Sequence, residues 1–224
     1  MIKNMLPLFF SILLLSGCGD GLSTGTTDNS ANITKALLTG TWEAKCVDNK
    51  TASTSSMSVL VFSDSGDNLT STTTNYSDLS CVSKSFVFTN KFNSLDLNNN
   101  KNTTSQNQII YKYSASISDI SIEPQTSSAS SSFNGSNYCG LSGWSPGTEK
   151  SVAGQTCYST TYKSVNENYF DIIQMNSEKT FIRLGNITNA ESTGYPKTLY
   201  TQEYYKYYPD HSNHSPLNRG KNKP

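Results

Sequence analysis

Residues 169–184 read YFDIIQM-NSE-KTFIRL and carry the clearest hairpin pattern in the chain. From Tyr169 to Met175 the even-numbered side chains face one way and the odd-numbered ones the other, as in a β-strand. Asn176-Ser177-Glu178 supplies turn formers, and Lys179–Leu184 then continues the extended pattern. This stretch therefore predicts two antiparallel strands joined by a tight turn.

Similar alternation recurs along the chain. Further strands are expected at residues 41–46, 57–62, 69–76, 109–113, 117–122, 158–165 and 199–208, with another beginning at residue 86. The polar runs at residues 98–108, 127–132 and 140–154 are expected to be loops. Ile33 to Leu38 could make one helical turn, but no segment shows sustained helical periodicity.

These segments predict an all-β fold. The simplest arrangement is an antiparallel meander that closes into a β-barrel, because closure removes exposed strand edges. A β-sandwich is the alternative. At this length one domain is the default, and we place it at residues 35–208.

The N-terminus carries a targeting pattern. Lys3 precedes a short apolar run, Met5 to Leu15, which ends in Leu15-Ser16-Gly17-Cys18. The run is too short for a stable membrane-spanning helix, although an uncleaved anchor is the alternative. The four residues resemble the lipobox of bacterial lipoproteins. The resemblance implies that residues 1–17 are a signal peptide and that Cys18 carries a diacylglycerol and an acyl chain, with no other cofactor expected.

The same resemblance predicts where the protein lies. Gly19 after the cysteine, rather than aspartate, is typical of lipoproteins sent to the outer membrane of two-membrane bacteria. Residues 18–34 are small and polar and are expected to form a flexible tether. Residues 209–224 are expected to be a disordered polar tail. We therefore expect a protein of the bacterial cell envelope, anchored to the lipid bilayer by its acylated N-terminus.

Charge excludes one class of partner. The chain has 17 basic and 17 acidic residues. Loss of Lys3 with the signal peptide would leave a slight negative charge. This balance argues against nucleic acid as a partner, because such binding depends on neutralising phosphates.

Four cysteines remain once Cys18 is acylated: Cys46, Cys81, Cys139 and Cys157. An even number outside the cytosol predicts two disulfides, for which three pairings are possible. We favour Cys46 with Cys81 and Cys139 with Cys157, because each pair closes a moderate loop. In the chain-entropy account each bond would contribute about 3 kcal/mol. Reduced core cysteines are the alternative.

Two family resemblances bear on the fold. Gly40-Thr41-Trp42, after a short helical turn, resembles the first strand of lipocalins and lipocalin-like proteins. In those families the tryptophan closes the barrel floor beneath a late arginine, which implies a pair of Trp42 with Arg183. The spacing of Tyr76-Ser77-Asp78-Leu79-Ser80-Cys81, a Cys-Gly and Trp loop, and Tyr204-Tyr205-Lys206 resembles small uncharacterised bacterial lipoproteins. That second resemblance implies no known activity.

Catalytic and metal-binding patterns are sparse. Both histidines, His211 and His214, lie in the polar tail, so no nucleophile has an evident histidine base. Asp64 and Asp67 are explained by the turn that they occupy. We assign no catalytic residue and no metal ligand, and expect no enzymatic activity.

Aromatic residues suggest binding instead. Trp144, Tyr204, Tyr205 and Tyr207 are candidate contacts for a protein or glycan partner, since exposed aromatic rings provide rigid contact area. The preferred hypothesis is a non-enzymatic envelope lipoprotein that binds a partner or has a structural role. The alternative is a lipocalin-like carrier of a small apolar ligand, which requires an apolar cavity. An envelope hydrolase ranks third.

Overall fold

The computed structural model describes residues 31–188 and 190–208. Cys18 and both histidines therefore lie outside the described residues. In chain order the elements are α1 (Lys35–Leu38), β1 (Gly40–Ala44), β2 (Val47–Asn49), β3 (Thr54–Phe62), β4 (Leu69–Tyr76), β5 (Lys84–Thr103), β6 (Ile109–Pro124), α2 (Ser127–Gly135), the 3-10 turn η1 (Tyr138–Gly140), β7 (Lys150–Ser151), β8 (Thr156–Cys157), β9 (Thr160–Thr161), β10 (Asn168–Met175), β11 (Phe181–Leu184) and β12 (Tyr204–Lys206). Neither described helix is long and apolar enough to cross a membrane.

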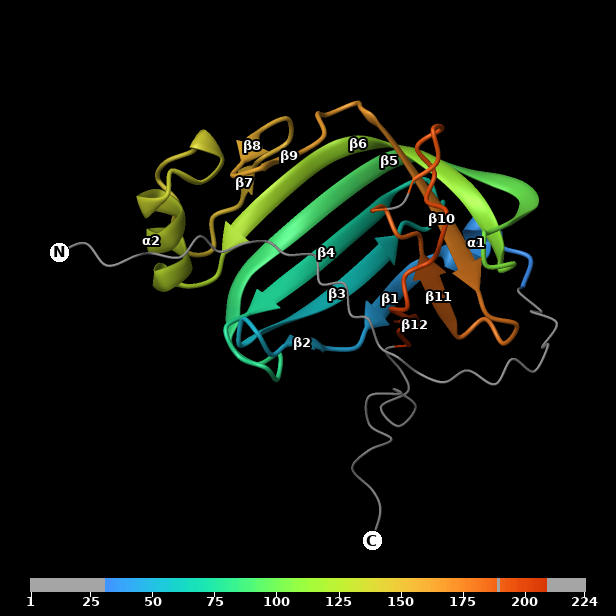
Figure 1. The fold of residues 1–224 in the computed structure, drawn as a ribbon, viewed down its shortest axis with the longest axis horizontal. Helices are drawn as coiled ribbons and strands as arrows, with labels where there is room; N and C mark the ends of the chain where they lie inside the picture. The colour runs from blue at the N-terminus through green and yellow to red at the C-terminus, as the bar shows by residue number, and fades with distance from the viewer. Residues whose placement is uncertain (1–30, 189, 209–224) are drawn as a thin grey trace, which may run out of the picture.

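Antiparallel strands form a closed ring (Figure 1). Its order is β1-β3-β4-β5-β6-β10-β11-β12, and β12 pairs again with β1. Trp42 of β1 lies opposite Leu60 on one side and Lys206 on the other. The predicted antiparallel meander and its closure are confirmed, and the β-sandwich alternative is wrong.

The predicted hairpin is present, because β10 and β11 pair with Ile173 opposite Leu184. The longest strands differ from the prediction. β5 has 20 residues and β6 has 16, and both are long, strongly curved strands of the ring (Figure 1). The loop expected at residues 98–108 is strand as far as Thr103, and the turn is confined to Thr104–Gln108. Pairing with β6 satisfies the backbone of this Asn-rich run, which overrides its weak strand propensity.

Two segments near the ring's edge also differ. The serine-rich connector expected at residues 127–132 is part of α2, which begins after Thr126. The hydroxyl of Thr126 accepts a hydrogen bond from the Ala129 N–H at 3.1 Å, a helix N-cap. The last strand is confined to Tyr204–Lys206.

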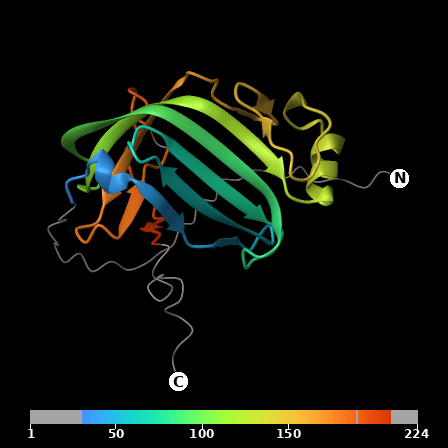
Figure 2. The same ribbon diagram turned by 180° about the vertical axis from the view of Figure 1, so that it is seen from behind.

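The two helices lie at opposite ends of the ring, and the reverse view agrees (Figures 1 and 2). At the α1 end, Leu38 and Trp42 are buried in the central core. Ile33 is 3% exposed, and the Ala31 N–H donates to the Met175 carbonyl at 3.3 Å. Residues 31–34 therefore belong to the folded body, which corrects the predicted tether boundary at residue 34.

Two disulfides brace the ring. Cys46–Cys81 links the end of β1 to the loop after β4, and Cys139–Cys157 links η1 to β8. The favoured pairing is confirmed. The second bond ties η1, which follows α2, to the short β8–β9 hairpin, and these segments form one covering layer at the end of the ring opposite α1.

Candidate functional site

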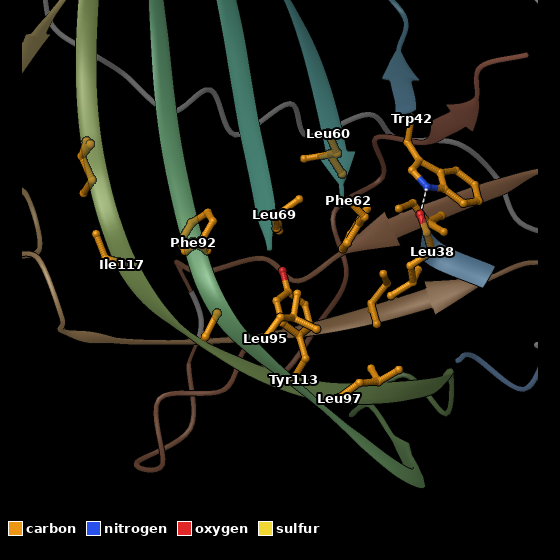
Figure 3. Close-up of a cluster of buried hydrophobic side chains, with 14 of the residues drawn as sticks. Leu38, Trp42, Leu60, Phe62, Leu69, Phe92, Leu95, Leu97, Tyr113 and Ile117 are labelled. Atoms are coloured by element: carbon orange, nitrogen blue, oxygen red, sulfur yellow. Dashed lines mark hydrogen bonds between the residues drawn. The ribbon is translucent and has the colours of Figure 1, made fainter. Parts of the chain in front are cut away.

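A cavity of about 800 Å³ lies inside the ring. Its wall is mostly aromatic and aliphatic: Leu60, Leu69, Phe88, Phe92, Tyr113, Ile117, Ile120, Tyr138, Tyr162 and Tyr169. Figure 3 shows part of this wall, with Leu60, Leu69, Phe92, Tyr113 and Ile117 contributed by successive strands. The arrangement offers a small apolar compound a site removed from water.

The hollow arises from the choice of inward residues on two neighbouring strands. On β4, Leu69 and Ser71 line the cavity, and on β5 the alternate positions Phe88, Asn90 and Phe92 do so. Ser71 lies directly opposite Asn90 in the pairing of the two strands. These small inward side chains leave volume that leucine or phenylalanine would occupy, so the cavity follows from the period-two pattern.

The cavity reaches the surface between two segments. Tyr158, beside β8, and Ile187, in the connection from β11 to β12, both line it and are 56% and 52% exposed. Lys163 also lines this mouth, but its Nζ lies 2.7 Å from the Glu167 carboxylate. The mouth therefore combines two exposed apolar side chains with a neutralised lysine.

An aromatic cluster supports the covering layer. Phe133 of α2 stacks on Tyr138 with 4.7 Å between ring centroids, and Tyr138 meets Tyr158 at 5.2 Å. Trp144 packs on Phe133 at 5.2 Å and is only 3% exposed. The prediction that Trp144 offers an exposed binding surface is therefore wrong, since it serves as core beneath this layer.

A buried carboxyl group lies behind the cavity wall. Asp171 of β10 is 1% exposed, and its Oδ2 accepts hydrogen bonds from the hydroxyls of Tyr113 (3.0 Å) and Tyr169 (2.9 Å). Its Oδ1 accepts from the backbone N–H groups of Ile172 (2.7 Å) and Gly185 (3.0 Å). A Cβ at Gly185 would collide with Oδ1, so glycine permits this close approach.

Burial raises the pKa of Asp171 from 3.8 to about 7, because a carboxylate loses hydration there. The four hydrogen bonds favour the charged form and offset part of the rise. No basic side chain in the described residues forms an ion pair with Asp171. The site therefore holds a carboxyl group with neutral donors only.

The α1 end is closed differently from the prediction. The Trp42 indole N–H donates to the Leu38 carbonyl at 2.6 Å (Figure 3). The cation over its ring is Lys206, whose Nζ lies 5.2 Å from the ring centroid and donates to the Leu37 carbonyl. Arg183 instead pairs with Glu203 on the outer face. The predicted Trp42–Arg183 pair is wrong because strand alternation directs Arg183 away from the interior.

The C-terminal tyrosines do not form one surface. Tyr204 points inward, and burial raises its pKa to about 12. Tyr205 points outward with its ring 5.8 Å from that of Phe181, and Tyr207 is 49% exposed. Sequence reasoning missed the cavity aromatics, such as Phe88 and Tyr169. Their alternation with small residues on neighbouring strands was the available signal.

The remaining predicted sites give little further chemistry. Asp67 pairs with Lys35 of α1 at 2.6 Å, so it joins the turn to the helix. Within the described part of the chain, no three histidine, cysteine or acidic side chains cluster as metal ligands would.

No protein-family model matches the chain, and no curated protein matches its sequence.

Proposed function

We propose that this protein is a non-enzymatic carrier of the bacterial cell envelope, which binds a small and largely apolar ligand inside its ring of strands. The observation that carries the proposal is the cavity of about 800 Å³. Its volume lies within the range typical of small-molecule sites. Acylation of Cys18 would hold this carrier at a membrane, most simply the outer membrane.

The cavity changes the order of the sequence-based hypotheses. Binding a partner or serving a structural role came first. That hypothesis predicts a filled interior, and its candidate contacts were the aromatic residues named above. Trp144 is buried, and Tyr204 and Tyr205 face opposite sides of the sheet. The carrier hypothesis requires a hollow apolar interior, and so it becomes the preferred one.

Filling the cavity tests the proposal. Ser71→Phe places a large ring in the cavity, whereas Thr72→Phe places the same ring on the outer face of the same strand. The probe is the neutral fluorophore N-phenyl-1-naphthylamine, added to residues 19–224, which include every described residue. We expect Ser71→Phe to weaken probe binding by about tenfold or more, equivalent to about 1.4 kcal/mol. Thr72→Phe should leave binding unchanged.

Native mass spectrometry adds a second test. The protein, purified gently from its own host, should carry a small molecule that Ser71→Phe lacks. Equal probe affinity in both variants, together with no bound molecule in the native protein, would rule out the carrier proposal.

The anchor needs a separate experiment. Cys18→Ala should abolish incorporation of labelled fatty acid and release the protein from the membrane fraction, because the acyl chains supply the attachment. Unchanged membrane retention would contradict the lipoprotein assignment, whatever the outcome for the cavity.

A further inference from the structure

Two tyrosine hydroxyls on the cavity wall bind a buried carboxyl group, an arrangement that an apolar ligand alone does not explain. Tyr113 and Tyr169 both line the cavity, and both hydroxyls donate to the same oxygen of Asp171. Each tyrosine therefore uses its only hydroxyl hydrogen in the hydrogen bond that it donates to the carboxyl group. The phenolic oxygens can therefore accept a hydrogen bond from a ligand but cannot donate one.

Once ionised, Asp171 also places an uncompensated negative charge beside the cavity. Its four partners are two hydroxyls and two backbone N–H groups, all of them neutral. Burying a carboxylate without a counter-charge costs several kcal/mol. Lys163, a lysine that lines the cavity, is already paired with Glu167. A cationic ligand would supply the charge that the protein lacks.

The aromatic rings next to Asp171 fit the same ligand. Tyr169 packs against Phe92 with 4.7 Å between centroids and lies 6.4 Å from Tyr113. All three rings line the cavity. Aromatic faces attract ammonium groups, and the attraction reaches about 2 kcal/mol when water is excluded.

We propose that the ligand is an amphipathic organic amine, with its ammonium group against Tyr113 and Tyr169 and its apolar part along Leu60, Leu69 and Ile117. The inference rests on the proposed carrier function and adds the chemical class of the ligand. A fatty-acid anion is disfavoured, because its carboxylate would meet a negative charge and two hydroxyls with no proton left to donate.

Binding should depend on pH through Asp171. The titratable groups that face this carboxyl are tyrosines from three further segments and from its own strand: Tyr113 on β6, Tyr169 on β10, Tyr200 before β12 and Tyr204 on β12. Their pKa values are all raised above 10, so they stay neutral between pH 5.5 and 8. An alkylamine stays charged over this range. A change in amine affinity over this range that Asp171→Asn removes therefore reports Asp171.

The experiment compares three ligands with the same eight-carbon chain: octylamine, 1-octanol and octanoate. Each displaces N-phenyl-1-naphthylamine from residues 19–224 at pH 8 and at pH 5.5. At pH 8 we expect octylamine to bind about tenfold more tightly than octanol. At pH 5.5 its affinity should fall by about tenfold as Asp171 becomes protonated, while that of octanol stays constant. Asp171→Asn should remove the preference for the amine over the alcohol at pH 8.

The outcomes separate the two proposals. Equal affinity for octylamine and octanol at pH 8, with the fluorophore still bound, would overturn the amine inference and leave the carrier proposal standing. Tighter binding of octanoate than of octylamine at pH 8 would also overturn the amine inference. Failure of the fluorophore and of all three ligands to bind would contradict the carrier function itself. If Asp171→Asn does not fold, the pH comparison on the unmodified chain decides the matter.

Discussion

The two ends of the ring are built from the same alternating pattern, but one end is packed with side chains and the other is hollow. At the α1 end, Trp42 is fully buried, with its indole N–H bound to Leu38 and Lys206 above its ring. Toward the α2 end, Ser71 and Asn90 occupy inward positions, and a cavity of about 800 Å³ remains. The size of the inward side chains, and not the strand pattern, thus decides whether the interior is packed or hollow.

Because of this contrast, stability and ligand binding should depend on different ends of the ring. The closed end has a complete core, so substitutions there should lower stability with little effect on ligand affinity. The hollow end has an unfilled cavity and a buried carboxyl group beside it, so substitutions there should alter binding, its pH dependence, or both.

The largest effect is expected at the closed end. Trp42→Ala should lower the free energy of unfolding by about 5 kcal/mol, because it leaves a large void and an unpaired Leu38 carbonyl. Chemical denaturation measures the loss, and N-phenyl-1-naphthylamine binding should change by less than about twofold. Phe88→Ala, on the cavity wall, is the comparison and should weaken binding. A reversed pattern would show that the two ends are not separable.

Asp171 should make stability fall as pH rises. Its pKa is 3.8 in the unfolded chain and about 7 in the folded one, so the folded state holds the proton longer. The contribution of Asp171 to stability is therefore highest below pH 4, decreases between pH 4 and pH 7, and is constant above that window. The whole change attributable to Asp171 is about 4 kcal/mol. It is measured as the difference between denaturation profiles of the unmodified protein and Asp171→Asn. Parallel profiles would contradict the raised pKa.

The two disulfides should differ in their effect on ligand release, because Cys157 lines the cavity whereas Cys46 and Cys81 do not. Replacing both Cys139 and Cys157 by serine should cost about 3 kcal/mol and also speed ligand release, because Cys157 lines the cavity. The matched change at Cys46 and Cys81 should cost a similar amount without changing release. Stopped-flow dissociation of the fluorophore gives the rates. Equal acceleration in both variants would mean that the covering layer does not control the mouth.

The smallest effect is expected from replacing Lys206, the cation over the Trp42 ring at the α1 end. Lys206→Met should cost about 1 kcal/mol, since it removes the charge over Trp42 and the hydrogen bond to the Leu37 carbonyl. It should also shift the tryptophan emission. Arg183→Met is the matched control on the outer face and should leave the emission unchanged. An equal shift in the control would contradict the assignment of Lys206 as the cation over Trp42.

Local pattern predicted part of this arrangement. The β10–β11 hairpin and the extent of β4 follow from alternation and turn residues, and the disulfide pairs follow from loop length. The extent of β5 does not follow from local pattern, because its Asn-rich run is a strand only through pairing with β6. The Asp171 site needs Gly185, 14 residues away, to approach it. Such contacts depend on register between distant segments, which one strand's pattern does not contain.

Closure of the ring also dictates when the fold can be completed. The first strand pairs with the last, since Trp42 lies opposite Lys206. A chain emerging from a ribosome, or crossing a membrane in an extended state, cannot make this contact until residue 206 is available. Contacts across such long separations slow folding. Until then Trp42 lacks the cation that covers its ring, so the protein gains its full stability only in the final step of its assembly.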